Sequence, residues 1–381
     1  MIHFGLSVEH RMLREALRTY VQQEVAPLAK RGEETKAFPR ELIPKLAAHG
    51  YIGMKYPEER GGQGLDILAE CILIEELTRA SAGVSAGVFA HSHLGIGPIV
   101  YFGTDAQIKQ YAMPAIRGEA IAGFALTEPG AGSDVKAIQT RAKRIGEKYV
   151  INGAKVFTTN GTIADYLIVA AYTRPELAVG GISIFIVDTN TPGITRAPLR
   201  KLGNWSSDTA EIAFVDVQVS EENRVGPEEG GFKQLMRILT EGRIVVAARA
   251  VALAELAYEK ALAYARERRA FGRPIGSFQG IGFKLARMSI DIDAARLLTY
   301  RAAHLSMNGE DCRAEASKAK YFASSVAQRV TTEALHVHGG YGYTVEYEVE
   351  RLYRDAPESV IGEGTAEIQL RIISKSLGLM E

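Results

Sequence analysis

The hydrophobic period of this 381-residue chain changes twice, and that change limits the folds it can adopt. Apolar side chains recur at helical spacing in residues 1–120, give way to short β-type runs in 121–228, and return to helical spacing in 229–381. Helices and strands bury their apolar faces in different ways, so each stretch needs its own packing partner. We therefore expect an α+β protein with an N-terminal helical domain, a central β-barrel or sandwich and a C-terminal four-helix bundle.

Capping and turn residues place the expected helices. Ser7 and Asp66 stand at N-cap positions, and Pro39 opens another helix that stops at Gly50. The helices expected in the first domain cover residues 7–30, 40–49, 66–77 and 105–116. Those expected in the last domain cover residues 232–269, 278–307, 314–337 and 365–377, and their length and alanine content suit a bundle.

Short runs of β-type residues occupy the middle of the chain, at 149–151, 156–159, 166–171, 182–187 and 211–219. Asn152-Gly153 lies between the first two runs, which predicts a two-residue hairpin because such turns favour this pair. Pro192-Gly193 predicts a second turn.

The charge balance restricts the partners. The chain has 45 basic and 45 acidic residues, so it lacks the surplus of Lys and Arg that binds phosphate backbones, which argues against nucleic acid as the main partner. Its two cysteines, Cys71 and Cys312, provide no disulfide framework and indicate a reducing compartment. The first residues lack the apolar segment of a signal peptide, and no run of about 20 apolar residues predicts a membrane span. We expect a cytoplasmic protein.

Three segments suit a cofactor, although each also has an ordinary structural interpretation. TEPGAGSD (127–134) is a glycine-rich turn that could hold an anion or be a plain hairpin loop. VFTTNG (156–161) puts Phe157 and Thr159 on one face of a strand, which could line a flat heterocycle or form a simple apolar face. RERRAFGRP (266–274) could clamp a diphosphate or be a solvated helix end.

Two further segments place glycines beside helices. In HVHGGYGYT (336–344) the histidines are two residues apart and make a poor metal pair, so packing against a ligand or a neighbouring chain is the alternative. In GEGTAEIQ, Thr365 can cap the helix that follows, and Gly362 and Gly364 free the backbone on both sides of Glu363. Such a turn can point the carboxylate into a cleft, although an exposed glutamate is the commoner case.

The order of these motifs is more specific than any one of them. TEPGAGSD and VFTTNG are followed by SDT (207–209), GRI (242–244), RRAFG (268–272), HGGYGYT (338–344) and EGTAEIQ (363–369). Together they resemble the acyl-CoA dehydrogenase family over essentially the whole chain. The resemblance implies a helical, β and helical domain order, FAD between the β-domain and the C-terminal bundle, and a homotetramer built from two dimers.

The resemblance also implies which residues contact FAD. Leu126 and Thr127 would meet the pyrimidine end of the flavin, Phe157 and Thr159 would cover the ring near N5, and Ser133 would lie where substrate and diphosphate meet. The residues that would reach FAD bound mainly by the neighbouring subunit are Arg268, Phe271 and Gln279, with Gly339 and Gly340 close to the same cofactor. The other implied contacts are Thr365 and Glu367, and His336, which stands where glutamine is common in the family.

In the same resemblance, Glu363 is the base that takes the α-proton of an acyl-CoA while the β-hydrogen leaves as hydride to the flavin. The backbone N–H of Glu363 and a ribityl hydroxyl would stabilise the developing enolate oxygen. Burial beside an apolar acyl chain should raise the pKa of this carboxyl group toward neutrality. Arg243 resembles an arginine that supports CoA binding, and Ser133, Gly362 and Gly364 complete the expected substrate contacts.

Some positions depart from the family pattern. Gly362 replaces a tyrosine that is common before the glutamate, which predicts room for a branched or cyclic acyl group. Relatives with a displaced base carry an acid immediately before the arginine, but here Gly242 holds that place, and Glu241, one residue further back, is a poor rival. His91 and His93 lie in the segment expected near the substrate, where they could assist proton movement or be structural.

Two other functions are compatible with single motifs. A monooxygenase or oxidase of the same fold would typically lack the glutamate at position 363, and a non-enzymatic helical interaction protein would purify without FAD. The resemblance favours an electron-transferring flavoprotein as the electron acceptor, although no motif encodes this partner.

Overall fold

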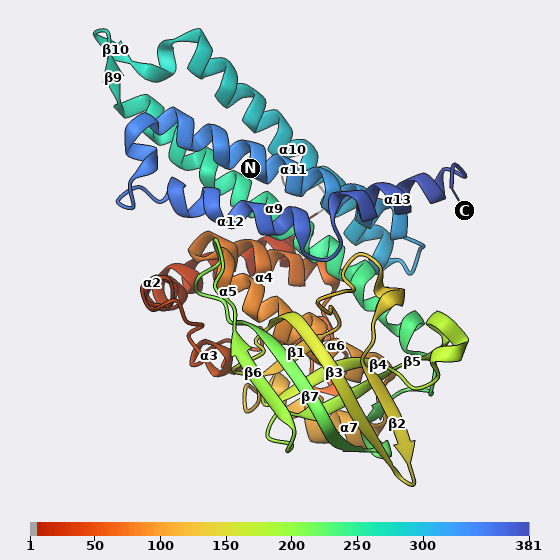
Figure 1. The fold of residues 1–381 in the computed structure, drawn as a ribbon. Coiled ribbons are helices and arrows are strands. Elements are labelled where there is room, and N and C mark those ends of the chain that lie inside the picture. Colours follow the sequence, from red (N-terminus) through yellow and green to blue (C-terminus); the bar gives the residue numbers. More distant parts are fainter. Residues whose placement is uncertain (1–5, 381) are drawn as a thin grey trace.

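The computed structural model describes residues 6–380, and its three parts follow the predicted order of helical, β and helical structure. Figure 1 shows helices α4 (Ile67–Ala80) and α5 (Ala82–Phe89) of the N-terminal domain between the C-terminal helices and the β-sheet. One hydrophobic core runs through both helical domains and reaches one face of the sheet, and a smaller core lies inside the β-domain. The N-terminal helices therefore fix the position of the bundle relative to the sheet.

Side-chain caps set the starts of the N-terminal helices, as predicted. Ser7 Oγ accepts a hydrogen bond from the His10 N–H at 3.2 Å, and Asp66 Oδ1 accepts one from the Ala69 N–H at 2.8 Å. The other helices of this domain are α1 (Val8–Tyr20), α2 (Ala26–Thr35), α3 (Leu42–Ala48), α6 (Gly97–Phe102), α7 (Asp105–Gln107) and α8 (Met113–Ile116). Between them lie π-helical segments at Val21–Val25, Ala90–Ile96 and Ile108–Ala112, and a 3₁₀ turn at Glu58–Arg60.

The sequence pattern does not predict α5, the π-helical segment after it, or α6. All residues of Ala82–Phe89 and Ala90–Ile96 except Ala86 are buried. A helix that is buried on every side has no polar face, so its sequence carries no amphipathic period.

The β-domain is one eight-stranded sheet whose two halves enclose a core, which corresponds to the sandwich form of the prediction. Its path is β6-β7-β3-β2-β4-β5-β8, and β1 pairs in parallel with β4. The halves are joined by the single pair Arg141 and Tyr172, and the core between them contains Phe185 from one half and Phe214 from the other. The strands are β1 (Ala122–Ala125), β2 (Arg141–Ile145), β3 (Lys148–Thr159), β4 (Tyr166–Tyr172), β5 (Ile182–Asp188), β6 (Ile194–Pro198), β7 (Thr209–Ser220) and β8 (Arg224–Val225).

The predicted hairpin at Asn152-Gly153 is wrong, because β3 runs straight through it. The turn between β2 and β3 lies at Gly146, whose φ is +61°. Asn152 Nδ2 instead donates to Asp216 Oδ1 of β7 at 3.1 Å, and Asn152 Oδ1 accepts from the Asp216 backbone N–H at 2.9 Å. Gly153 lies at a bulge, where a Cβ would come within 2.7 Å of Thr140 Cα. The Asn-Gly pair therefore serves a bulge rather than a turn. The second predicted turn, at Pro192-Gly193, is confirmed between β5 and β6.

The C-terminal domain is helical as predicted, but the helices that form the bundle differ from the predicted ones. Helices α9 (Gly231–Glu267), α10 (Gln279–Met307) and α11 (Arg313–His338) correspond to predicted helices, and α12 (Val349–Ile361) packs against α9 and α11 as a further member. Pro357 lies inside α12, and an internal proline normally argues against a helix. The last helix, α13 (Ala366–Ser376), packs on α11 and leads away from the bundle toward the C-terminus (Figure 1). A two-stranded hairpin of β9 (Arg269–Ala270) and β10 (Arg273–Pro274) joins α9 to α10.

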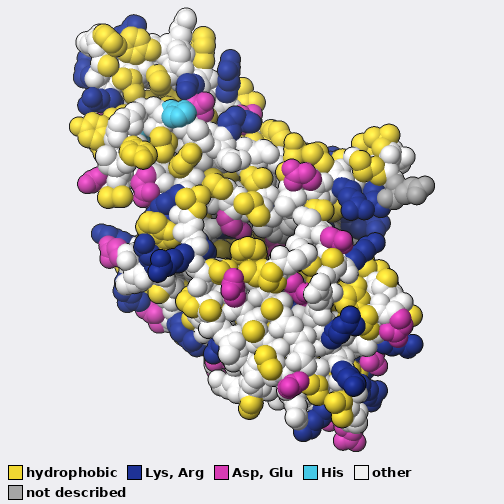
Figure 2. Space-filling model, viewed as in Figure 1, with side chains coloured by type: hydrophobic (Ala, Val, Ile, Leu, Met, Phe, Trp, Pro, Cys, Tyr) yellow, Lys and Arg dark blue, Asp and Glu magenta, His cyan; other side chains and the backbone are white. Residues whose placement is uncertain are grey.

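Charged side chains of both signs are spread over the face drawn in Figure 2, and hydrophobic side chains gather where the bundle meets the two lower domains. Within residues 6–380, no helix combines the length and the apolar character that a membrane crossing needs.

Candidate active site

Glu363 lies in the short loop between α12 and α13, in a left-handed backbone conformation. Its φ is +54° and that of Gly364 is +93°, whereas Gly362 has an ordinary φ of −62°. The expectation that glycines free the backbone on both sides of Glu363 is therefore correct only for Gly364. A left-handed non-glycine residue costs roughly 1–2 kcal/mol, so surrounding contacts must hold it.

Two buried side chains hold this loop through its carbonyl groups. Lys320 Nζ donates to the carbonyl oxygens of Val360 and Gly364, at 2.9 and 2.6 Å. Gln369 Nε2 donates to those of Glu363 and Gly364, at 3.1 and 2.9 Å. The sequence interpretation did not identify either residue. Lys320 occupies a core position of α11, and a lysine at such a position is the signal that could have found it.

The carboxylate of Glu363 points into the protein. Its Oε2 atom is buried and has no hydrogen-bond partner among the described residues. Gly242 of α9 leaves the space that this oxygen uses, because a Cβ at Gly242 would lie 3.1 Å from Oε2. The same Cβ position is 3.4 Å from Phe89 Cζ and 3.6 Å from His93 Nε2. Oε2 therefore lies in a small space bordered by α9 and the segment around α5.

Burial raises the pKa of Glu363 above its ordinary value, and the neighbouring Arg243, His93 and Lys320 side chains oppose this rise. Arg243 is only 6% exposed, and its Nε has no hydrogen-bond partner among residues 6–380. Burial lowers the pKa of Arg243, and the charge of Glu363 counteracts the effect. A buried arginine with a free donor beside a buried carboxylate is suited to contact an anionic or carbonyl group.

Glu241, the rival acid, is tied into a separate buried network. Its Oε2 accepts from Lys55 Nζ at 3.1 Å and from the Tyr101 hydroxyl at 3.2 Å, and Lys55 also pairs with Glu70 at 2.9 Å. Burial alone would raise the pKa of Glu241, but Lys55 and His93 outweigh it and lower the pKa. Glu241 is therefore a weaker base than Glu363.

The two histidines differ in their surroundings. His91 Nδ1 accepts from the Ala122 N–H at 3.0 Å and its Nε2 lies 3.2 Å from the Ala115 carbonyl oxygen, so the ring links the helical domain to β1. Burial lowers the pKa of His91 to about 4, which keeps it neutral. His93 Nδ1 lies 2.8 Å from Lys55 Nζ, which connects it to the Glu241 network. This geometry favours a structural role for His91.

The ends of β1 and β3 bring four of the predicted flavin contacts together. The Thr127 carbonyl accepts from the Val156 N–H at 2.9 Å, which places Leu126 and Thr127 beside Phe157. Phe157 lies at a bulge with a φ of +57° and is 68% exposed. Thr159 is also partly exposed and the residue between them is buried, as alternation predicts.

A buried ion pair anchors the TEPGAGSD loop to β3. Lys155 Nζ lies 2.8 Å from Glu128 Oε1 and donates to the Leu126 carbonyl at 2.9 Å. Glu128 also accepts from the Thr140 N–H at 3.0 Å. Burial lowers the pKa of Lys155 to about 8, with Glu128 opposing the shift. Ser133 lies in the exposed part of this loop. The sequence interpretation did not single out Lys155 or Glu128.

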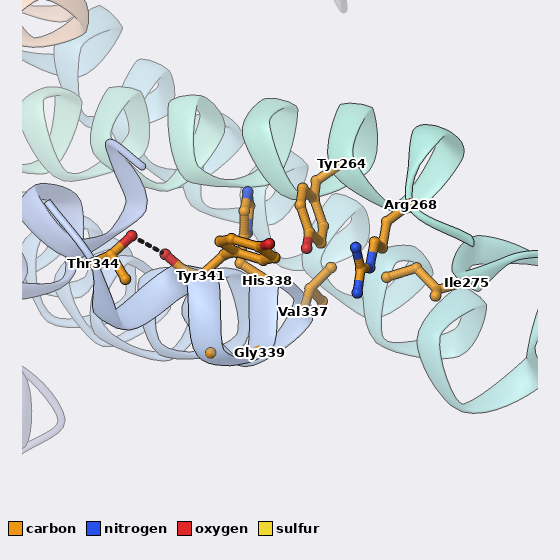
Figure 3. A pocket seen from close by; sticks show the side chains of 9 residues that line it. Tyr264, Arg268, Ile275, Val337, His338, Gly339, Tyr341 and Thr344 are labelled. Carbon is orange, nitrogen blue, oxygen red and sulfur yellow. Dashed lines mark hydrogen bonds between the residues drawn. The ribbon is translucent and has the colours of Figure 1, made fainter. Parts of the chain in front are cut away.

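A third group of predicted residues lies at the far end of the bundle. Arg268, Gly339 and Gly340 line a pocket of about 460 Å³ together with Tyr264, His338 and Tyr341. Figure 3 shows the rings of Tyr264 and Tyr341 near Arg268 at this pocket, and the Arg268 guanidinium lies 5.7 Å from the Tyr341 ring centre.

The side chains next to this pocket are exposed. Phe271, at the tip of the β9–β10 hairpin, is 93% exposed, and Gln279 at the start of α10 is also exposed. His336 points outward and lies 3.9 Å from Glu333, and it is not among the residues that line the pocket. Among residues 6–380, no group of three or more His, Cys, Asp or Glu side chains is placed to hold a metal ion.

The predicted cofactor residues thus form separate groups in one protomer. Figure 1 shows the β9–β10 hairpin at the end of the bundle opposite the sheet, so Arg268 and Phe271 lie far from Phe157. Thr365 occupies the N-cap position of α13, but its side chain makes no capping hydrogen bond, so the predicted side-chain cap is wrong. Glu367 is exposed in the first turn of that helix.

Three family models match successive parts of the chain. They describe the acyl-CoA dehydrogenase N-terminal domain over residues 7–119, the middle domain over 123–217 and the C-terminal domain over 229–378. The chain belongs to the acyl-CoA dehydrogenase family. Family members are FAD flavoproteins that oxidise CH–CH bonds, so this acyl-CoA dehydrogenase is an FAD-dependent oxidoreductase, and the non-enzymatic alternative is wrong.

Individual relatives agree over the whole length. An acyl-CoA dehydrogenase of Bacillus subtilis (strain 168) is 45% identical over 370 residues, which are 97% of this chain and 98% of that protein. A subunit of the caffeyl-CoA reductase–Etf complex of Acetobacterium woodii is 38% identical, over 97% of this chain and 98% of that protein. The solved structure of butyryl-CoA dehydrogenase from Megasphaera elsdenii matches with a TM-score of 0.95 at 39% identity, and covers 99% of this chain and 100% of that one.

The residues of this acyl-CoA dehydrogenase fit a flavin. An exposed aromatic ring on a left-handed bulge, Phe157, lies beside Thr127, and Thr159 on the same face is partly exposed. At the far end of the bundle, a Cβ on Gly339 or Gly340 would meet no atom within 4 Å. Both regions therefore have surface and polar atoms available to a bound group.

Replacing Lys155 with methionine should weaken FAD binding at least tenfold. The change leaves Glu128 buried without its cation, at a cost of about 3–5 kcal/mol, and frees the loop that carries Thr127. Titration of the apoprotein with FAD measures the dissociation constant. The matched control is Lys148→Met, at an exposed position of the same strand. Equal FAD affinity in the two variants would contradict an anchoring role for Lys155.

Proposed function

We propose that Glu363 removes the α-proton of an acyl-CoA thioester and that the product is the corresponding 2-enoyl-CoA. The observation that carries this proposal is the buried Oε2 of Glu363, which has no hydrogen-bond partner among the described residues. Burial raises its pKa, which makes it a stronger base than an exposed glutamate. The glutamate also argues against a monooxygenase or oxidase of the same fold.

In this proposal, different residues of the chain hold the proton, bind the thioester oxygen and support the CoA thioester. FAD, when bound, accepts the β-hydrogen as hydride. Glu363 holds the α-proton on its carboxylate, and its backbone N–H, fixed by the left-handed turn, donates to the thioester oxygen. Arg243 supports the CoA thioester, and the backbone of Gly362 and Gly364 lies next to it at the base.

Cofactor binding is shared between two protomers in this proposal. Leu126, Thr127, Phe157 and Thr159 hold the flavin ring of their own protomer, and Ser133 lies where substrate and diphosphate meet. The residues proposed for the remaining contacts are Thr365, Glu367, His336, Arg268, Phe271, Gln279, Gly339 and Gly340. The distance between the β-domain and the β9–β10 hairpin in Figure 1 supports contacts from a neighbouring protomer, and hence a homotetramer of two dimers.

An electron-transferring flavoprotein is the proposed electron acceptor. Its support is the similarity to a subunit of the caffeyl-CoA reductase–Etf complex, whose name includes such a partner.

The proposed substrate carries a branched or cyclic acyl group. Gly362 has no side chain beside the base, where relatives commonly have tyrosine, and the caffeyl group in the name of one relative contains a ring. The matching butyryl-CoA dehydrogenase is named for a straight-chain substrate. The caffeyl-CoA relative therefore predicts a preference for ring-bearing acyl groups, and the butyryl-CoA relative predicts a preference for straight chains.

Glu363→Gln should keep its FAD and lose flavin reduction by at least about a thousandfold, because the amide cannot accept the α-proton. Anaerobic mixing with acyl-CoA and the loss of flavin absorbance measure the rate. The comparison variant is Glu241→Gln, which should lose far less activity because that carboxylate is already paired with Lys55. Normal flavin reduction by Glu363→Gln would contradict the proposed base.

Flavin reduction should require the deprotonated form of Glu363. The rate should therefore fall as the pH drops through the pKa of this group, and that pKa lies above the ordinary 4.5 because of burial. The pH dependence of kcat/KM for the wild-type enzyme measures the midpoint. A rate that stays constant down to pH 4.5 would argue against a buried carboxylate base.

A panel of acyl-CoA substrates measures the acyl preference. Flavin bleaching by butyryl-CoA, isobutyryl-CoA and 3-phenylpropanoyl-CoA should show at least tenfold higher kcat/KM for a branched or ring-bearing substrate. Gly362→Tyr should reduce that preference, because its side chain would push Glu358 Oε1 aside and put a phenol ring beside the base. A clear preference of the wild type for butyryl-CoA would refute this substrate class.

A further inference from the structure

The place of the missing side chain at Gly362 is taken by a second carboxylate. A Cβ built on Gly362 would lie closer to Glu358 Oε1 than any real contact allows. Glu358 is on the preceding turn of α12, and its carbonyl accepts the Gly362 N–H at 2.8 Å. A side chain at position 362 would therefore have to displace this charged group.

Glu358 is held there by a buried arginine. Arg249 of α9, which is 4% exposed, donates to Glu358 Oε2. Its other N–H groups donate to the Ala82 carbonyl at 2.8 Å and to Asn204 Oδ1 at 3.0 Å. Contacts to three separate segments fix the guanidinium, so the carboxylate that it binds has a defined position.

The outer side of Glu358 is open. Its side chain is 47% exposed although Arg249 beside it is buried, and Oε2 binds Arg249 while Oε1 is the oxygen next to Gly362. Burial would raise the pKa of Glu358, but Arg249, Lys320 and Lys201 outweigh it and lower the pKa. The group is therefore a fixed anion and hydrogen-bond acceptor at neutral pH.

This acceptor lies beside the loop that carries Glu363. Arg249 and Gly242 are seven residues apart on α9, which is about 10 Å along the helix axis, and Gly242 borders the Glu363 carboxylate. Helix α5 runs beside the same stretch, with Phe89 near Glu363 and Ala82 at Arg249. A substituted acyl group whose α-carbon meets Glu363 is within reach of Glu358.

We infer that Glu358 determines acyl specificity by accepting a hydrogen bond from a donor group on the acyl chain and by rejecting a carboxylate at the same place. The inference rests on the proposed function of Glu363. It narrows the substrate class to acyl groups that are uncharged or carry an O–H or N–H donor. Arg249 is the positioning residue for this contact.

A matched pair of thioesters tests the inference. Glutaryl-CoA and its terminal amide, 4-carbamoylbutanoyl-CoA, have nearly the same shape, but one ends in an anion and the other in an N–H donor. Adipyl-CoA and its terminal amide repeat the comparison with one more carbon. We expect wild-type kcat/KM for flavin reduction to be at least tenfold higher for the amide of one pair. Glu358→Gln should cut that ratio at least fivefold, because an amide side chain can also donate to a carboxylate.

Glu358→Gln leaves Arg249 without its carboxylate partner and could fold poorly for that reason. A second variant therefore tests the inference independently. Gly362→Ala keeps both charges and pushes the flexible end of Glu358 aside, so it should lower the same ratio. Bound FAD and the melting temperature identify variants that are correctly folded.

The outcomes separate this inference from the proposed function. An unchanged amide-to-acid ratio in both folded variants overturns the role of Glu358. Rejection of all four thioesters by an enzyme that oxidises an unsubstituted acyl-CoA overturns it as well. Failure of every acyl-CoA to bleach the flavin would instead contradict the proposed function itself.

Discussion

A carboxylate can act as a base inside a protein only if the groups around it leave its proton-accepting oxygen unoccupied. Hydrogen-bond donors near Glu363 are instead directed at the backbone: Lys320 and Gln369 bind carbonyl oxygens of its loop. These bonds offset the left-handed conformation of Glu363, while its Oε2 stays buried and without a partner among the described residues. The catalytic proposal depends on this separation between a satisfied backbone and an unsatisfied side chain.

Three other acids are paired with cations instead. Glu241 is paired with Lys55, Glu358 with Arg249 and Glu128 with Lys155, and each of these pairs includes a buried cation. Pairing lowers the pKa of each acid, so these carboxylates remain charged and are poor bases. Chemically identical side chains therefore differ in function because of what lies within hydrogen-bond distance.

The distance between the two groups of proposed cofactor residues bears on how protomers assemble. Phe157 is in the β-domain, whereas Arg268, Phe271 and Gly339 lie at the opposite end of the bundle (Figure 1). Phe271 is almost fully exposed on a hairpin tip, and an exposed aromatic side chain beside an open pocket is a feature of surfaces that meet a partner or ligand. In the proposed site, these residues would contact FAD bound by a neighbouring protomer.

The sequence by itself determined the order of helical and β domains, the N-caps at Ser7 and Asp66, and Glu363 as the candidate base, because these depend on local spacing and on short motifs. It did not determine α5, whose buried faces leave no period, or the bulge at Gly153, where packing against Thr140 overrides the turn preference of Asn-Gly. The contacts of Lys155, Lys320 and Arg249 were decided only by the tertiary structure. Each is a charged residue whose partner is at least 27 positions away in the chain, and a contact of that kind exists only once separate elements have packed together.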